Sequence, residues 1–150
     1  MELIAAGLDS ARREGLSFEG VAGRIVDDAR RDGKRLPGFG HRVHATIDPR
    51  VDVLFGLAEE VGLAGDGIRF ARAVEVAIRD RLKPIPLNID GALAAILVDI
   101  GLPSMVGKLI FIVGRVAGLS AEVLEEYTRE KPMRIKIPVA YDGVPPRKDD

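Results

Sequence analysis

The sequence of 150 residues is 47% hydrophobic and 30% charged, with a formal net charge of −1 at pH 7. It is too apolar for a disordered chain and too nearly neutral to favour nucleic acid as a partner. The absence of cysteine excludes a disulfide framework and a thiolate metal site. The N-terminus does not read as a signal peptide, and the apolar runs GALAAILV and LIFIVG fall short of the about 20 residues of a membrane span. We therefore expect a soluble, cytoplasmic, single-domain protein.

Apolar residues at helical spacing dominate the first half of the chain. The first predicted helix ends before Gly15, Ser17 can cap the second, and Asp48 followed by Pro49 marks the start of the third. A fourth helix is predicted over 67–82, before a rigid connector that contains two prolines. The faces expected to be buried are Leu3, Ile4, Leu8 and Ala11 in the first helix, Phe18, Val21, Ile25 and Ala29 in the second, Val51, Leu54, Leu57 and Val61 in the third, and Ile68, Ala71, Val74 and Ile78 in the fourth.

Three further helices are predicted in the second half. Asn88 can cap a helix over 89–101 that is apolar nearly all round, so we expect it to be buried at the centre. A similarly apolar segment begins at Pro103, and Ser120 can cap a last helix that stops before Pro132. We find no convincing alternation of strands. The sequence thus predicts an all-α single domain of roughly seven helices.

Both histidines of the chain lie in one stretch, LPGFGHRVHATIDPR, at positions 41 and 44. Their spacing would place two metal ligands on one turn of a helix, but the neighbouring glycines and proline argue against a helix there. A metal site also needs at least three suitable ligands, and the sequence has no further histidine or cysteine to offer. We therefore expect no metal. Two interpretations of the histidine pair remain: an ordinary solvated loop, or a loop that binds a ligand or takes part in catalysis.

Three other polar residues bear on that choice. Arg50 stands at the start of a predicted helix, an end that favours anions. Asp90 lies in the first turn of the most apolar helix, where it either supports the helix dipole or acts as a general base at the edge of the core. Arg115 interrupts an apolar run, where a buried arginine is costly unless it meets an anion. Together they suggest an anion-binding catalytic site, although each alone has a structural explanation.

Three motifs in this order carry a family resemblance: PGFGHRVHATIDPR, PLNIDGALAAIL and IFIVGRVAGL. The chain resembles the C-terminal, small-domain part of the citrate synthase superfamily from about residue 1 to 143. It is most similar to citryl-CoA lyase and the lyase module of ATP-citrate lyase. The resemblance implies that residues 1–15 correspond to the end of the family's large domain, 16–130 to the small domain, and 131–150 to a C-terminal tail.

The resemblance also implies roles for single residues. His41 would bind the keto or hydroxyl oxygen of the four-carbon acid, and Asp90 would move the proton of the acetyl methyl group. Arg50 and Arg115 would bind substrate carboxylates. No role follows for His44, and its replacement is expected to matter little.

Coenzyme A is the second ligand that the resemblance implies. The backbone around Leu36 and Gly38 would embrace the adenine, and Lys83 would lie near the CoA. No bound cofactor is expected, since CoA and acetyl-CoA are substrates of an acyltransferase or lyase that also handles oxaloacetate.

Family members carry another histidine in an HGG-like motif, which this sequence lacks. We therefore expect a component that acts with a separate large-domain chain, and as partners either further copies of this chain in a homo-oligomer or that large-domain subunit. The alternative is an inactive module that binds CoA or a dicarboxylate, or that serves dimerisation. Arg134 and Lys136 are both candidates for a residue that reaches a neighbouring subunit. The direction of reaction and the choice between citryl-CoA and a methylcitryl analogue stay open.

Overall fold

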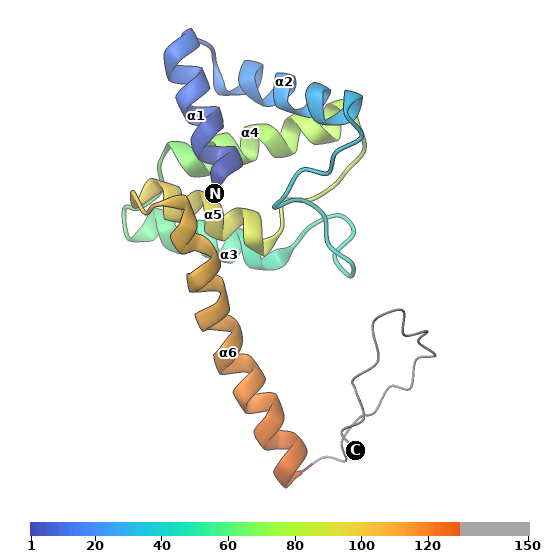
Figure 1. The fold of residues 1–150 in the computed structure, drawn as a ribbon, viewed down its shortest axis with the longest axis vertical. Coiled ribbons are helices and arrows are strands. Elements are labelled where there is room, and N and C mark those ends of the chain that lie inside the picture. The colour runs from blue at the N-terminus through green and yellow to red at the C-terminus, as the bar shows by residue number, and fades with distance from the viewer. Residues whose placement is uncertain (130–150) are drawn as a thin grey trace, which may run out of the picture. The chain divides into compact units, whose positions relative to one another are not determined.

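The computed structural model describes residues 1–129 of the chain, which form six α-helices (Figure 1). No strand occurs among these residues, although Phe39 and Leu87 form an isolated antiparallel bridge. The chain divides into two compact units, Met1–Gly114 and a second that begins at Arg115. The helices are α1 (Glu2–Glu14), α2 (Phe18–Arg31), α3 (Pro49–Glu60), α4 (Asp66–Arg81), α5 (Ile89–Asp99) and α6 (Ser104–Thr128).

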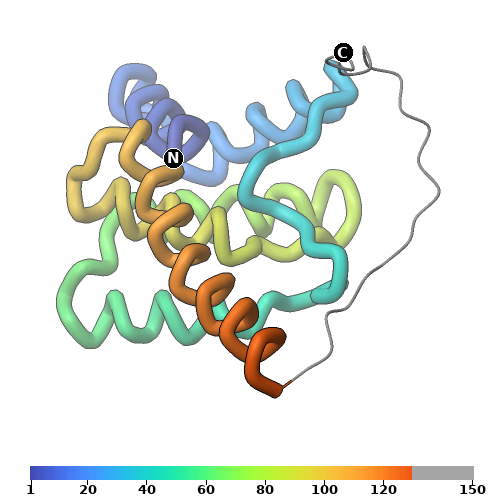
Figure 2. The backbone as a smooth tube through the Cα atoms, turned by 60° about the horizontal axis from the view of Figure 1, so that its bottom comes forward, coloured from blue at the N-terminus to red at the C-terminus, as the bar shows by residue number. Residues whose placement is uncertain are grey.

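Helix α4 is the centre of the first unit, because it packs against α1, α2 and α5 (Figure 2). Its predicted inner face is confirmed: Ile68, Ala71, Val74 and Ile78 are all buried. Helix α5 lies between α4 and α3 and also touches α1. It buries one face and leaves the opposite face half-buried, so it is less enclosed than its composition suggested.

The predicted face of α3 is partly wrong. Val51 is buried as expected, but Leu57 is 50% and Val61 66% exposed, whereas Phe55 and Ala58 are buried instead. Burying the aromatic ring removes more apolar surface from water than burying a leucine. The face of α3 is therefore turned to place Phe55 in the core.

The two helices predicted after Pro103 are one continuous helix, α6. Ser120 does not cap a new helix, because its hydroxyl donates to the Val116 carbonyl at 2.8 Å, within the turn before it. None of the residues of α6 is buried, and by length and composition alone this helix could cross a membrane. That property is weak grounds for a membrane span. The apolar LIFIVG segment is thus left uncovered, whereas α1 buries Ile4, Leu8 and Ala11, as its pattern predicted.

The loop between α2 and α3 is tied to the connector before α5. The Gly40 amide donates to Pro86 at 2.7 Å, and the Asn88 amide donates to Gly38 at 3.0 Å. Gly38 has a φ of 88°, and a Cβ added there would lie 2.8 Å from the Gly91 Cα atom. Only glycine permits this backbone geometry and this close approach. The loop is thereby fixed beside the first turn of α5.

Candidate active site

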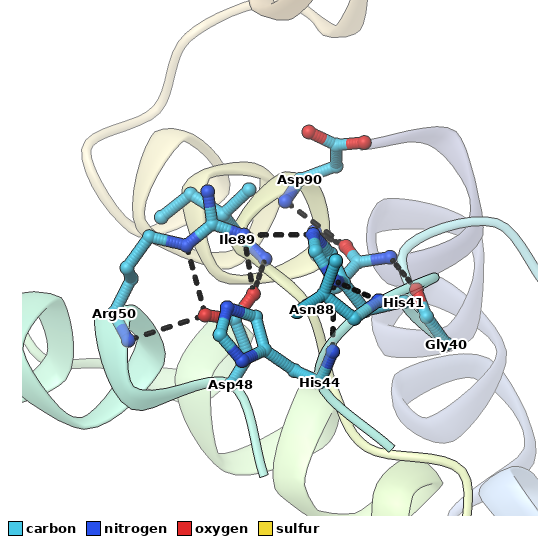
Figure 3. A network of polar contacts seen from close by, with 10 residues as sticks. Gly40, His41, His44, Asp48, Arg50, Asn88, Ile89 and Asp90 are labelled. Carbon is cyan, nitrogen blue, oxygen red and sulfur yellow. Dashed lines mark hydrogen bonds and ion pairs between the residues drawn. The ribbon is translucent and has the colours of Figure 1, made fainter.

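The candidate site lies where this loop meets the N-termini of α3 and α5 (Figure 3). Its centre is Asp48, whose side chain is buried and is the one buried charged group among residues 1–129. Asp48 caps α3, as the sequence predicted, by accepting the Arg50 amide at 3.2 Å. The same carboxylate accepts the amide of Ile89, on α5, at 3.1 Å. One carboxylate therefore holds two helix N-termini together.

The guanidinium of Arg50 forms a forked ion pair with Asp48. Its Nε donates to one carboxylate oxygen at 2.9 Å, and an η nitrogen donates to the other at 2.7 Å. The Arg50 hydrogen bonds hold the pKa of Asp48 well below its ordinary value, in spite of burial. Asp48 in turn raises the pKa of Arg50, with a smaller contribution from Asp90. Arg50 is therefore a fixed cation, with its side chain 45% exposed.

His41 is oriented by its own loop. Its Nδ1 atom accepts the backbone amides of Val43 and His44, each at 3.1 Å. In the neutral ring the proton is then on Nε2, which makes this nitrogen a donor. The loop thus selects the tautomer of His41.

The donor side of His41 faces Arg50. The Nε2 atom lies 3.3 Å from the η nitrogen of Arg50 that also binds Asp48. Because both nitrogens carry hydrogens, neither satisfies the other. An oxygen of a ligand could accept from both, so this pair is suited to a carbonyl, hydroxyl or carboxylate oxygen.

His44 lies against the ring of His41. The two ring centroids are 4.6 Å apart with planes inclined by 32°. His44 is half-buried, whereas His41 is exposed. His44 therefore contacts His41 twice, through its backbone amide and through its ring.

Asp90 lies in the first turn of α5, as predicted, but its side chain is exposed rather than held against a dry core. Its amide donates to the cap residue Asn88 at 3.0 Å, and its carboxylate points away from the Asp48 cluster (Figure 3). It lines a cavity of about 550 Å³ whose wall is mostly apolar and includes Leu93, Leu97 and Lys108. Asp90 thus faces a mostly apolar cavity that Arg50 does not line.

A second cavity, of about 670 Å³, is lined by His41 and other residues of the same loop. Two of the predicted CoA-binding residues, Leu36 and Lys83, are in its wall, and Gly38 is not. Gly38 instead packs against α5. The cations around this cavity are Arg30, Lys34, Arg35, Arg42 and Lys83, and no carboxylate is among the described residues that line it.

Arg115 is not part of the first unit. It lies on α6 at the first residue of the second unit, so this structure does not fix its distance from His41, Arg50 and Asp90. Arg134 and Lys136 lie outside the described residues. Within residues 1–129 no group of three or more histidine, aspartate or glutamate side chains could hold a metal ion.

Sequence reasoning assigned Asp48 and Asn88 only to helix caps. Both do cap their helices, and both have a second contact that ties the site together: Asp48 binds the α5 amide, and the Asn88 side-chain amide donates to the Gly40 carbonyl at 2.8 Å. The sequence indicates this second role only through the positions of the two residues. Each cap stands within two residues of a candidate site residue.

The site thus groups His41, Arg50 and the Asp48 carboxylate at the N-termini of two helices of an all-α domain. The chain is a member of the family described as citrate synthase, C-terminal domain, whose model matches residues 8–136. The citrate synthase of Haloferax volcanii is 34% identical over 112 residues, covering 73% of this chain and 29% of that protein. The putative citrate synthase 2 of Mycobacterium tuberculosis is 34% identical over 149 residues, covering 95% and 38%.

The solved structures that are similar to the chain include a citryl-CoA lyase and a citrate synthase. Citryl-CoA lyase from Hydrogenobacter thermophilus superposes with a TM-score of 0.70 at 35% identity, covering 97% of this chain and 57% of the other. Citrate synthase from Thermotoga maritima has a TM-score of 0.66 at 24% identity, covering 97% and 42%, and shows the fold alone. The chain therefore spans less than two thirds of the length of these relatives.

Proposed function

We propose that the chain is the small-domain component of an enzyme of the citryl-CoA lyase or citrate synthase type, handling acetyl-CoA and oxaloacetate. The observation that carries the proposal is the pair of donors on His41 and Arg50, 3.3 Å apart, beside the helix turn that holds Asp90. A four-carbon keto acid offers the oxygens that such a pair binds. The likeness to a citryl-CoA lyase at 35% identity supports the same substrate class.

The residues have complementary tasks in the proposed reaction. In synthesis, Asp90 takes a proton from the acetyl methyl group, and the resulting enol carbon attacks the keto carbon of oxaloacetate. The Nε2–H of His41 donates to the oxygen on which negative charge develops, and Arg50 binds a carboxylate. In cleavage the carbon–carbon bond breaks and Asp90 returns the proton. No metal takes part.

The cavity lined by Leu36 and Lys83 is the proposed CoA site. Its apolar floor suits an adenine ring, and its cations suit phosphates. We expect residues 1–150 to bind CoA with a Kd of about 10⁻⁵ to 10⁻³ M. Calorimetry should show that Lys83→Gln weakens binding by a factor of about 2–5, as for an exposed ion pair. Lys108→Gln, in the other cavity, should not change the Kd.

The proposal includes a separate large-domain chain and a location in the cytoplasm. The further histidine of the family's HGG-like motif, which would polarise the thioester carbonyl, is not among residues 1–150. Loss of such an electrophilic contact typically costs about 3–4 kcal/mol of the barrier. We therefore expect little turnover by the chain alone, and turnover on mixing with the large-domain chain.

The alternative is an inactive CoA-binding or dimerising module, which the exposed apolar side chains of α6 favour. Reconstitution separates the two functions. Cleavage of citryl-CoA to acetyl-CoA and oxaloacetate by the mixture supports the enzyme. CoA binding without cleavage supports the CoA-binding module. The absence of any heat at millimolar CoA would overturn both the enzyme and the CoA-binding module, and would leave the dimerising module.

A further inference from the structure

We propose that Asp48 is a positioning residue that sets the guanidinium of Arg50 and couples it to the helix turn that carries Asp90. As a role in catalysis, this inference rests on the proposed function. It concerns a residue that neither touches the expected substrate nor takes part in proton transfer.

The first ground is the cost of burying Asp48. A carboxylate that is 1% exposed loses nearly all its hydration, so the fold must supply donors in place of water. It supplies four, of which three belong to Arg50 and one to Ile89. A helix cap needs only one such bond, as Ser17 shows at the start of α2. The other three bonds serve something besides the cap.

The second ground is what the fork does to Arg50. The Nε atom and one η nitrogen are held by Asp48, which fixes the plane of the guanidinium. The side chain is still 45% exposed, so part of its donor set is open to a ligand. A ligand that meets a fixed guanidinium does not have to immobilise a flexible side chain. Asp48 thus prepares Arg50 for binding beside His41.

The third ground is the contact across the fold. The oxygen of Asp48 that accepts the η nitrogen of Arg50 also accepts the amide of Ile89. Ile89 immediately precedes Asp90, the proposed base. A change in the Arg50 contact must therefore change the bond to the first turn of α5. Such a coupling acts in both directions.

NMR of the isolated chain tests this arrangement without any activity. The two readouts are the exchange rate of the Arg50 Nε–H and the amide shifts of Ile89 and Asp90. Asp48→Asn keeps an oxygen for the helix cap but removes the charge, so the Nε–H should exchange about ten- to a hundredfold faster. The amides of Ile89 and Asp90 should move in the same variant.

Asp99→Asn is the matched control. The Asp99 carboxylate accepts the amides of Gly65, Gly67 and Ile68 at the start of α4, at 2.6–3.0 Å, and does not contact Arg50. It therefore has a comparable structural task away from the site. Its replacement should leave the Arg50 and Asp90 signals at their wild-type values. Wild-type signals in Asp48→Asn, or equal changes in both variants, would overturn the proposal.

A second pair of variants covers the case in which Asp48→Asn fails to fold. Arg50→Gln leaves the cap in place and removes the fork, so the Ile89 and Asp90 amides should still shift. Arg42→Gln, an exposed arginine of the same loop, should not move them. Unchanged amides in Arg50→Gln contradict the coupling.

Titration with oxaloacetate separates this proposal from the proposed function. If the wild-type chain shows no shift with oxaloacetate, but the variants respond as described, the positioning role stands and the function fails. If oxaloacetate binds and Asp48→Asn binds it as tightly as wild type, the positioning role fails and the function stands.

Discussion

The buried carboxyl group of Asp48 and its ion pair with Arg50 lead to a prediction of how the free energy of unfolding changes with pH. The folded pKa is lowered by Arg50, so the charged form favours the folded state above the ordinary pKa of about 3.9. This contribution is lost as the pH falls through that value and below it. We therefore expect the free energy of unfolding to decrease steeply below about pH 4–5.

Urea unfolding of wild type and Asp48→Ala at several pH values measures this effect. At pH 7 the variant should be less stable by at least about 2 kcal/mol, because a cap and charged hydrogen bonds are lost. Its stability should depend less on acid than that of wild type. Parallel curves for the two proteins between pH 3 and 7 would show that Asp48 is not the group concerned.

His44 leads to a second prediction at this scale. The stack on His41 changes our expectation from the sequence, where replacement of His44 appeared unimportant. An aromatic pair contributes about 0.5–1.5 kcal/mol, so His44→Ala should weaken oxaloacetate binding by a factor of about 2–10. His44→Phe keeps a ring and should restore most of the affinity. Equal affinities of the alanine variant and wild type would remove His44 from the site.

At the scale of elements, the close approach of the Gly38 and Gly91 backbones sets the position of the loop that carries His41. A Cβ on Gly91 would run into the Gly38 carbonyl, so Gly91→Ala should cost about 1–3 kcal/mol of stability by overpacking. Gly56→Ala is the control, because a Cβ there meets nothing within 4 Å and alanine favours a helix by about 1 kcal/mol. Thermal unfolding should give shifts of opposite sign. A stabilised Gly91→Ala variant would contradict the close approach.

The helix starts were predictable because caps are local. Ser17, Asp48 and Asn88 each accept an amide two or three residues further along, which the sequence order alone determines. The face of α3 was not predictable, since it depends on what packs against the helix. Ser120 has the residue type of a cap but continues the helix, because its hydroxyl bonds back to Val116.

The candidate site was predictable to a similar extent. His41 and Arg50 are brought together as the motif implied, and Leu36 and Lys83 share a cavity. The central role of the Asp48 carboxylate could not be predicted, because the bond from the Ile89 amide to Asp48 joins residues that are 41 positions apart. Such a contact depends on tertiary packing. The roles of the predicted residues remain to be measured.

At the scale of the whole molecule, the exposed side chains of α6 predict association. Val113 is 72% exposed and Leu109 60%, within a helix that buries none of its residues. Large apolar side chains exposed in such numbers on one helix normally mediate contacts. Sedimentation should show a homodimer or larger species that Val113→Glu weakens, whereas Val43→Glu, at a 78% exposed loop position, should not. A monomer at high micromolar concentration would contradict this.

The most direct test of the central claim is the turnover of citryl-CoA by this chain mixed with a large-domain chain. We predict acetyl-CoA and oxaloacetate as products without added metal, and a rate about 10²–10⁴-fold lower for Asp90→Asn, because an amide cannot accept the proton. Asp9→Asn, at an exposed position of α1, should retain the wild-type rate. If the mixture turns over and Asp90→Asn is as fast as wild type, Asp90 is not the base and the account of this site is wrong.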